Sequence, residues 1–119
     1  MPTEWPPNPA PLTIDVTDSG DDWCRMTVSG EFDMAGSPAF RRAVNDALGR
    51  GRQHIAVDTS AVRFMDSTGL TAVLSARVDV RDAGGTFRLT AVSSQVARLL
   101  NIAGLTYELV DGRGWRVTS

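Results

Sequence analysis

The chain has 119 residues, of which 42% are hydrophobic and 22% are charged, and its formal net charge is −2. This length suits one domain with a single core and is too short for two. The weak negative charge argues against a general affinity for nucleic acid, so direct DNA binding is not expected.

The sequence also bears on the compartment. A single cysteine, Cys24, cannot close an internal disulfide, which fits a reducing environment. No apolar run has the length of a membrane span, and the first residues lack the layout of a signal peptide. We therefore expect a cytoplasmic protein that does not enter a membrane, with a monomer as the default state.

The first part of the chain changes character near Leu12. Residues 1–11 hold five of the six prolines, which predicts a disordered N-terminal tail, and residues 12–119 are expected to form the folded domain. Alternating residues at 12–16 and 23–28, separated by a polar turn, predict an opening β-hairpin.

Helices and strands then alternate along the chain. A helix is expected with Ser37 as its N-cap and Gly49 just past its end, because Pro38 suits the first helical position and apolar residues follow at helical spacing. The remaining expected elements are a buried central strand at 54–58, a helix after residue 66 that stops at 84–85, a strand at 86–90, a helix capped by Ser93 or Ser94 that ends at Gly104, a strand at 107–110 and a short extended piece at 115–117.

This order, ββαβαβαβ, predicts an α/β domain. The sheet should be mixed and mostly parallel, with helices packed on it, because strands that alternate with helices require parallel crossovers. The apolar positions that we expect in the core of the second helix are Leu70, Val73, Leu74 and Val78, and those of the third helix are Val96, Leu99, Leu100 and Ile102.

Catalytic and metal-binding patterns are scarce. His54 is the only histidine, and no His/Cys cluster could hold a metal, so we expect no cofactor and no enzyme activity. Cys24 is interpreted as a small buried residue. Arg41 and Arg42 fall on a polar helix face, as solvated charge or part of a partner surface.

Three carboxylates, Asp33, Asp58 and Asp66, fall near the ends of expected strands. The carboxyl ends of parallel strands are where sites gather in such sheets. No substrate-positioning group accompanies these acids, so they give little support for an enzyme.

The segment 64–70, FMDSTGL, places a polar cluster between a buried strand and a helix. Asp66 or Ser67 could simply cap the helix. Alternatively, the hydroxyl of Ser67 could be presented for phosphorylation at the positive end of the helix, where the fold tolerates an anion but a docked partner would not. The residues alone leave both interpretations open.

Four landmarks in chain order resemble the STAS domains of bacterial anti-sigma factor antagonists. They are GEFD at 30–33, VDTS at 57–60, FMDSTGL at 64–70 and LLNIAGL at 99–105. The resemblance implies that the unphosphorylated protein binds an anti-sigma factor with serine kinase activity and thereby releases a sigma factor. It further implies that this kinase inactivates the antagonist and that a serine phosphatase restores it.

Carried over residue by residue, the resemblance assigns roles to five positions. Ser67 is the implied phosphoacceptor, Thr68 is a second candidate acceptor, and Asp33, Asp66, Ser67, Thr68 and Gly69 form the implied partner-binding surface. The alternative is a STAS module that binds a nucleotide or lipid, or that serves a sensory or transporter assembly. A hydrolase that uses Asp66 and Ser67 is disfavoured, because no base is placed to activate the hydroxyl.

Overall fold

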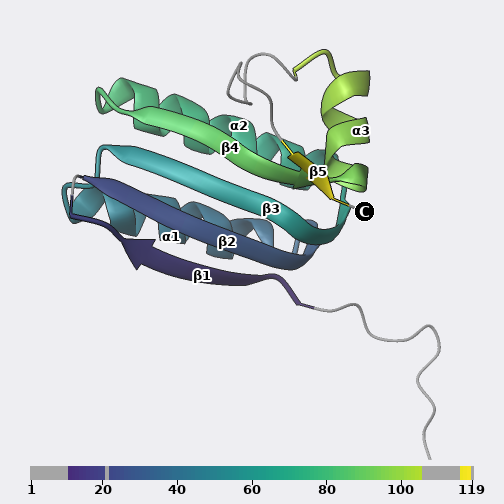
Figure 1. Ribbon diagram of the computed structural model, residues 1–119, viewed down its shortest axis with the longest axis horizontal. Helices are drawn as coiled ribbons and strands as arrows, with labels where there is room; N and C mark the ends of the chain where they lie inside the picture. The colour runs from purple at the N-terminus through teal and green to yellow at the C-terminus, as the bar shows by residue number, and fades with distance from the viewer. Residues whose placement is uncertain (1–10, 21, 106–115, 119) are drawn as a thin grey trace, which may run out of the picture.

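The computed structural model describes residues 11–20, 22–105 and 116–118. In chain order its elements are β1 (Thr13–Asp18), β2 (Trp23–Phe32), α1 (Ser37–Gly49), β3 (His54–Met65), α2 (Ser67–Asp82), β4 (Thr86–Ser93), α3 (Ser94–Ile102) and β5 (Arg116–Thr118) (Figure 1). The predicted α/β order is confirmed. The strand expected at 107–110 lies outside the described residues, as do residues 1–10 of the tail expected at 1–11. The last described strand, β5, is formed by the piece expected only to be extended.

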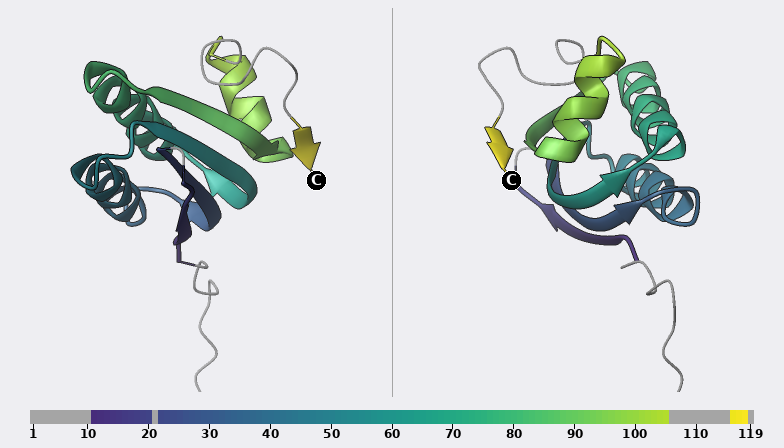
Figure 2. Two further views of the ribbon diagram at one scale, coloured as in Figure 1. Left: turned by 60° about the vertical axis from the view of Figure 1, so that its left-hand side comes forward. Right: turned by 90° about the vertical axis from the view of Figure 1, so that its right-hand side faces the viewer.

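The strands form one sheet in the order β1-β2-β3-β4-β5. β1 pairs antiparallel with β2, and each later pair is parallel, as predicted for an opening hairpin followed by crossovers. Helices α1 and α2 lie side by side over one face of the sheet, and α3 lies at the end where β3 and β4 finish (Figures 1 and 2). Among the described residues, no helical layer covers the opposite face of β1 to β4 (Figure 2).

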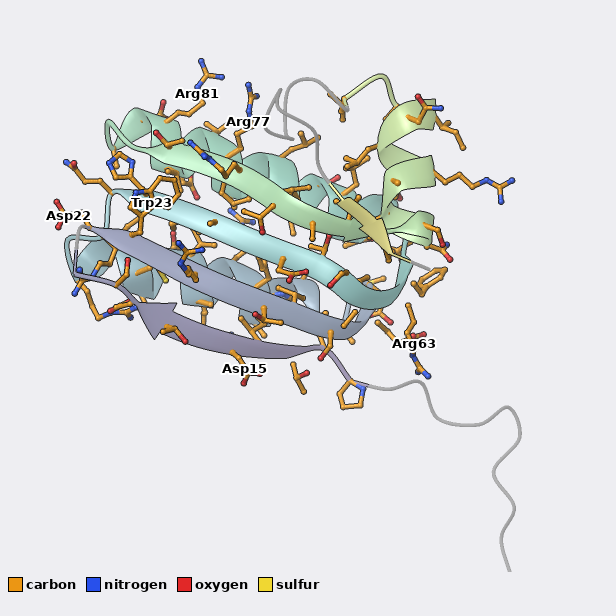
Figure 3. All side chains as sticks on the ribbon, viewed as in Figure 1. Asp15, Asp22, Trp23, Arg63, Arg77 and Arg81 are labelled. Carbon is orange, nitrogen blue, oxygen red and sulfur yellow. The ribbon has the colours of Figure 1, made fainter. Side chains whose placement is uncertain are left out.

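The core lies between the sheet and the two helices. Alternate residues of β2, namely Cys24, Met26 and Val28, are buried, and the ring of Phe32 lies 5.0 Å from that of Phe40 on α1. The side chains of Trp23 and Arg25 lie on the opposite face of the sheet from these buried residues, as strand alternation requires (Trp23 is labelled in Figure 3).

The buried face of α2 agrees only in part with the predicted one. Val73 is buried, and Leu70 and Leu74 are partly buried against the core, as expected, but Val78 is 52% exposed. The fully buried residues of α2 are Gly69, Ala72, Val73, Ala76 and Val80. Val78 lies about 140° around the helix from Val73, and small side chains let the helix approach the sheet closely. On α3, Val96 and Leu100 are buried but Ile102 is 73% exposed, because it lies about 120° from Val96.

Two predicted boundaries are also corrected. The N-cap of α1 is Gly36 instead of Ser37, which is the first helical residue. Strand β3 continues to Met65, so Asp58 lies within the strand and not near its end. The polar residues there are satisfied locally: the amide of Ser60 donates to Asp58 Oδ1 over 2.8 Å, and the hydroxyl of Thr59 donates to the carbonyl of Ala91.

Candidate functional site

The ends of two neighbouring strands place the candidate site. Phe32 and Met65, the last residues of β2 and β3, are partners in the parallel ladder. The residues that follow, Asp33 and Asp66, therefore leave the sheet at the same edge, and the amide of Asp66 donates to the carbonyl of Phe32 over 3.4 Å. Of the three carboxylates singled out from the sequence, the fold brings these two to one edge and leaves Asp58 in the sheet.

Asp66 caps α2. Its backbone is extended, and its Oδ1 accepts hydrogen bonds from the amides of Thr68 at 2.9 Å and Gly69 at 3.0 Å. A carboxylate at this position satisfies amides that have no partner within the helix and faces the positive end of the helix dipole. Of the two caps that the sequence left open, the structure uses the aspartate.

Ser67, the first residue of α2, is exposed. Its backbone carbonyl accepts a hydrogen bond from the hydroxyl of Thr71 at 2.8 Å, whereas its own hydroxyl bonds to none of the described residues. Thr68 is half-buried. Within the described residues, the side chain of Asp66 therefore caps the helix, whereas the side chain of Ser67 makes no hydrogen bond.

Gly69 allows α2 to begin directly against the end of β2. A Cβ atom added to Gly69 would lie 2.2 Å from the carbonyl oxygen of Phe32 and 3.0 Å from Cγ of Met65. No side chain fits at those distances. The glycine of the motif is therefore a packing requirement that fixes Ser67 relative to the strand ends.

Asp33 organises the turn between β2 and α1. Its carboxylate accepts from the amide of Gly36 at 3.1 Å, and its carbonyl accepts from both the amide and the hydroxyl of Ser37. Met34, which follows it, is 73% exposed. Sequence reasoning missed Met34, and the available signal was an apolar side chain in a turn expected to be polar.

A groove with a volume of about 500 Å³ runs between α1 and α2 beside this edge. Its walls include Arg41, Arg42 and Asn45 on α1, and Thr68, Thr71 and Ser75 on α2. Thr68 belongs both to the candidate motif and to the groove, so the two features adjoin.

Elsewhere in the described chain, the side chains that could bind a metal or act in catalysis are not grouped into a site. In the part of the chain that the structure describes, no three His, Cys, Asp or Glu side chains are grouped to hold a metal ion. His54 begins β3, at the opposite end from Met65, and its ring packs 5.0 Å from that of Trp23. Burial raises the pKa of the Cys24 thiol to about 11, with a further contribution from Asp18, so the thiolate is disfavoured.

Among the described residues, none of the helices combines the length and the apolar character needed to cross a bilayer.

An ion-pair cluster lies at the end of β1, away from the candidate site. At the end of β1, Asp18 pairs with Arg50 at 3.0 Å and with Arg52 at 3.3 Å, which ties the hairpin to the connection between α1 and β3. The hydrogen bond from Arg50 lowers the pKa of Asp18.

Known proteins resemble the chain over most of its length. The family model described as "Mlab, STAS domain" matches residues 7–111. An anti-sigma F factor antagonist of Paenibacillus polymyxa is 33% identical over 67% of this chain and 69% of its own, and the anti-sigma-B factor antagonist of Bacillus subtilis is 28% identical over 84% and 89%. A solved anti-sigma factor antagonist from Mycobacterium paratuberculosis superposes with a TM-score of 0.68 at 26% identity, covering 82% of each chain.

Proposed function

The chain belongs to the STAS domain family, and from this membership we propose that it is an anti-sigma factor antagonist that is inactivated by phosphorylation of Ser67. In the unphosphorylated state it binds an anti-sigma factor that is also a serine kinase, and a sigma factor is released. A serine phosphatase reverses the modification. The relatives named anti-sigma factor antagonists support the first part, and the geometry around Ser67 supports the second.

The exposed, unbonded hydroxyl of Ser67 is the observation that carries the proposal. A kinase must reach the oxygen and place a phosphate on it without unfolding the chain. Ser67 is exposed at the start of a helix whose cap is supplied by Asp66. Phosphorylation of Ser67 therefore removes no hydrogen bond of the hydroxyl within the described chain.

A phosphate at Ser67 would change the surface far more than the fold. It adds between about −1.5 and −2 charges and three acceptor oxygens. The helix dipole favours this charge and the neighbouring carboxylate of Asp66 opposes it, so the two effects on stability partly offset each other. An unpaired charge buried in an interface costs several kcal/mol, which corresponds to a loss of more than a hundredfold in affinity.

The surrounding residues complete a partner-binding surface. Asp33 and Asp66 leave the sheet at one edge, Gly69 fixes the helix start against it, and Thr68 stands next to Ser67 as a second candidate acceptor. We assign these residues, with Ser67, to the surface that meets the kinase.

The function is regulatory binding and not catalysis. His54, which lies at the other end of β3 from this site, cannot activate Ser67 as a base. We place the protein in the cytoplasm as a monomer. It need not contact DNA itself, because the sigma factor that it frees is the component that acts on transcription.

The test is phosphorylation by the purified anti-sigma factor of the source organism in the presence of ATP. Mass spectrometry should find one added phosphate on the wild type and none on Ser67→Ala, which should still bind. Ser67→Asp should bind poorly. Ser94 offers a matched control, because it is also an exposed serine at the first position of a helix, α3, and Ser94→Ala should be phosphorylated like the wild type.

Two results would contradict this assignment. One is phosphorylation of Ser67→Ala at the wild-type rate on a residue other than Thr68. The other is an anti-sigma factor that binds Ser67→Asp as tightly as the wild type, because the charge would then carry no signal.

A further inference from the structure

The groove between α1 and α2 extends well beyond the residues of the motif. A second part, of about 300 Å³, shares Arg41, Thr71 and Ser75 with the first and is lined further along by Leu74, Val78 and Asp79. From Thr68 to Val78 the helix rises about 15 Å. The two parts therefore line about three turns of α2, from Thr68 to Val78.

The part of the groove nearest the motif is basic. Arg41 and Arg42 are exposed on α1, and neither forms an ion pair within the described ranges. No acidic side chain of the described residues lines this part. Arg50, Arg52 and Arg63, by contrast, each form an ion pair, away from this groove. Arg41 and Arg42 are thus available to carboxylates of another molecule.

Exposed apolar side chains lie at the two ends of the groove. Met34 lines the first part and is 73% exposed, and Val78 lines the second part and is 52% exposed. Met34, the two arginines and Val78 thus follow one another along the groove, and Asp79 places the one acidic side chain of its described lining at the far end, beside Val78. A helix that carries apolar, acidic and apolar residues on one face would complement this order over the same three turns.

We propose that this groove binds an acidic, amphipathic helix of the anti-sigma factor. The proposal rests on the proposed function and adds the surface and the chemistry of the partner. Carboxylates of the partner helix pair with Arg41 and Arg42, and its apolar side chains cover Met34 and Val78. A helix is favoured over a small anion because the apolar ends are too far apart for one small molecule to cover both.

The position of the groove explains why phosphorylation of Ser67 would weaken binding of the partner. Thr68 lines the groove directly after Ser67, and the hydroxyl of Thr71, another lining residue, holds the carbonyl of Ser67. A phosphate on Ser67 therefore adds negative charge next to the mouth of a channel that receives an acidic partner. Like charges repel there, and the affinity falls without any change of fold.

The experiment measures binding of the purified anti-sigma factor of the source organism by titration calorimetry. The double variant Arg41→Glu/Arg42→Glu should bind at least about tenfold more weakly than the wild type. The control, Arg25→Glu/Arg98→Glu, changes the net charge equally at two exposed arginines, one on the sheet face away from α1 and α2 and one on α3. The control should bind within about threefold of the wild type. Met34→Ser should also weaken binding, without any change of charge.

The outcomes separate the two proposals. If the groove variant binds like the wild type while Ser67→Asp binds poorly, the groove proposal is overturned and the proposed function stands. Equal weakening by the groove variant and its control also overturns it, because the effect would then be one of net charge. If the wild type does not bind the anti-sigma factor at all, both proposals are wrong. Circular dichroism and thermal unfolding of each variant show whether it is folded, and Arg41→Gln/Arg42→Gln replaces the charge reversal if that variant is not.

Discussion

Replacement of Gly69 by alanine should destabilise the protein, although alanine is the better helix former. The new Cβ would lie 2.2 Å from the carbonyl oxygen of Phe32 and 2.9 Å from Cδ1 of the same residue. A carbon and an oxygen normally stay more than about 3.2 Å apart, so the start of α2 must move by about 1 Å. That movement would also strain the hydrogen bond from the amide of Asp66 to Phe32, which is already 3.4 Å long.

Two opposing effects determine how much Gly69→Ala changes the free energy of unfolding. Overpacking against a backbone atom costs about 3 kcal/mol, and exchange of glycine for alanine in a helix returns about 1 kcal/mol. The free energy of unfolding should therefore fall by about 2 kcal/mol, which lowers the melting temperature of a domain of this size by about 8 °C. Urea unfolding, followed by circular dichroism, measures the first quantity, and a thermal scan measures the second.

Gly49 is the matched control. It ends α1, and a Cβ added there would meet no atom within 4 Å. Gly49→Ala should therefore stabilise the protein by about 0.5 kcal/mol. If both variants are stabilised alike, the close approach of Gly69 to β2 does not exist in solution, and the reasoning that fixes Ser67 at the sheet edge is refuted.

Three further variants or reactions test other contacts of the structure. Asp66→Ala should lower the free energy of unfolding by about 1 kcal/mol and Asp66→Asn by much less, because asparagine also caps helices; equal losses in urea unfolding would exclude the capping role. Cys24 has a pKa raised to about 11, so about one thiol in a thousand is ionised at pH 8, and a thiol reagent should label it only after unfolding; rapid labelling of the native chain would contradict its burial. Arg50 lowers the pKa of Asp18, so the stabilisation is complete above the ordinary pKa of an aspartate and is lost as the pH falls through the lowered value. Asp18→Asn should therefore be less stable than the wild type near pH 7 and approach it in acid, and a difference that grows in acid would mean that this ion pair does not contribute.

Features governed by local chemistry could be predicted from the sequence. The cap of α3 at Ser93 and the glycine that ends α2, Gly84 with a φ of +85°, follow from rules that involve only a few neighbouring residues. The order of strands and helices follows from such signals as well. The polar cluster at 64–70 was correctly located because a strand exit and a helix start meet there.

Features that depend on distant residues could not be predicted. The requirement for Gly69 comes from the carbonyl of Phe32, on a different strand. The exposure of Val78 depends on which side of α2 faces the sheet, and that side is marked mainly by small residues such as Gly69, Ala72 and Ala76, which large apolar periodicity does not report. The groove requires the relative position of two helices, so the sequence indicated Arg41 and Arg42 only as solvated charge or part of a partner surface, and not as the wall of a groove.

The position at which β3 ends also depends on its pairing with neighbouring strands. Asp58 was expected near a strand end because it opens a polar run, yet both neighbouring strands pair with β3 through this region. Ladder hydrogen bonds and local side-chain bonds together keep a polar run inside a sheet. Polarity alone is therefore a poor indicator of where a central strand ends.

The unbonded hydroxyl of Ser67 also bears on the lifetime of the protein in the cell. A modification that breaks internal contacts makes a protein easier to unfold, and proteases then remove the modified form faster. Because the Ser67 hydroxyl holds no other described residue in place, the modified and unmodified chains should be degraded at similar rates. The ratio of the two forms would then report the balance of the enzymes that add and remove the phosphate, undistorted by turnover.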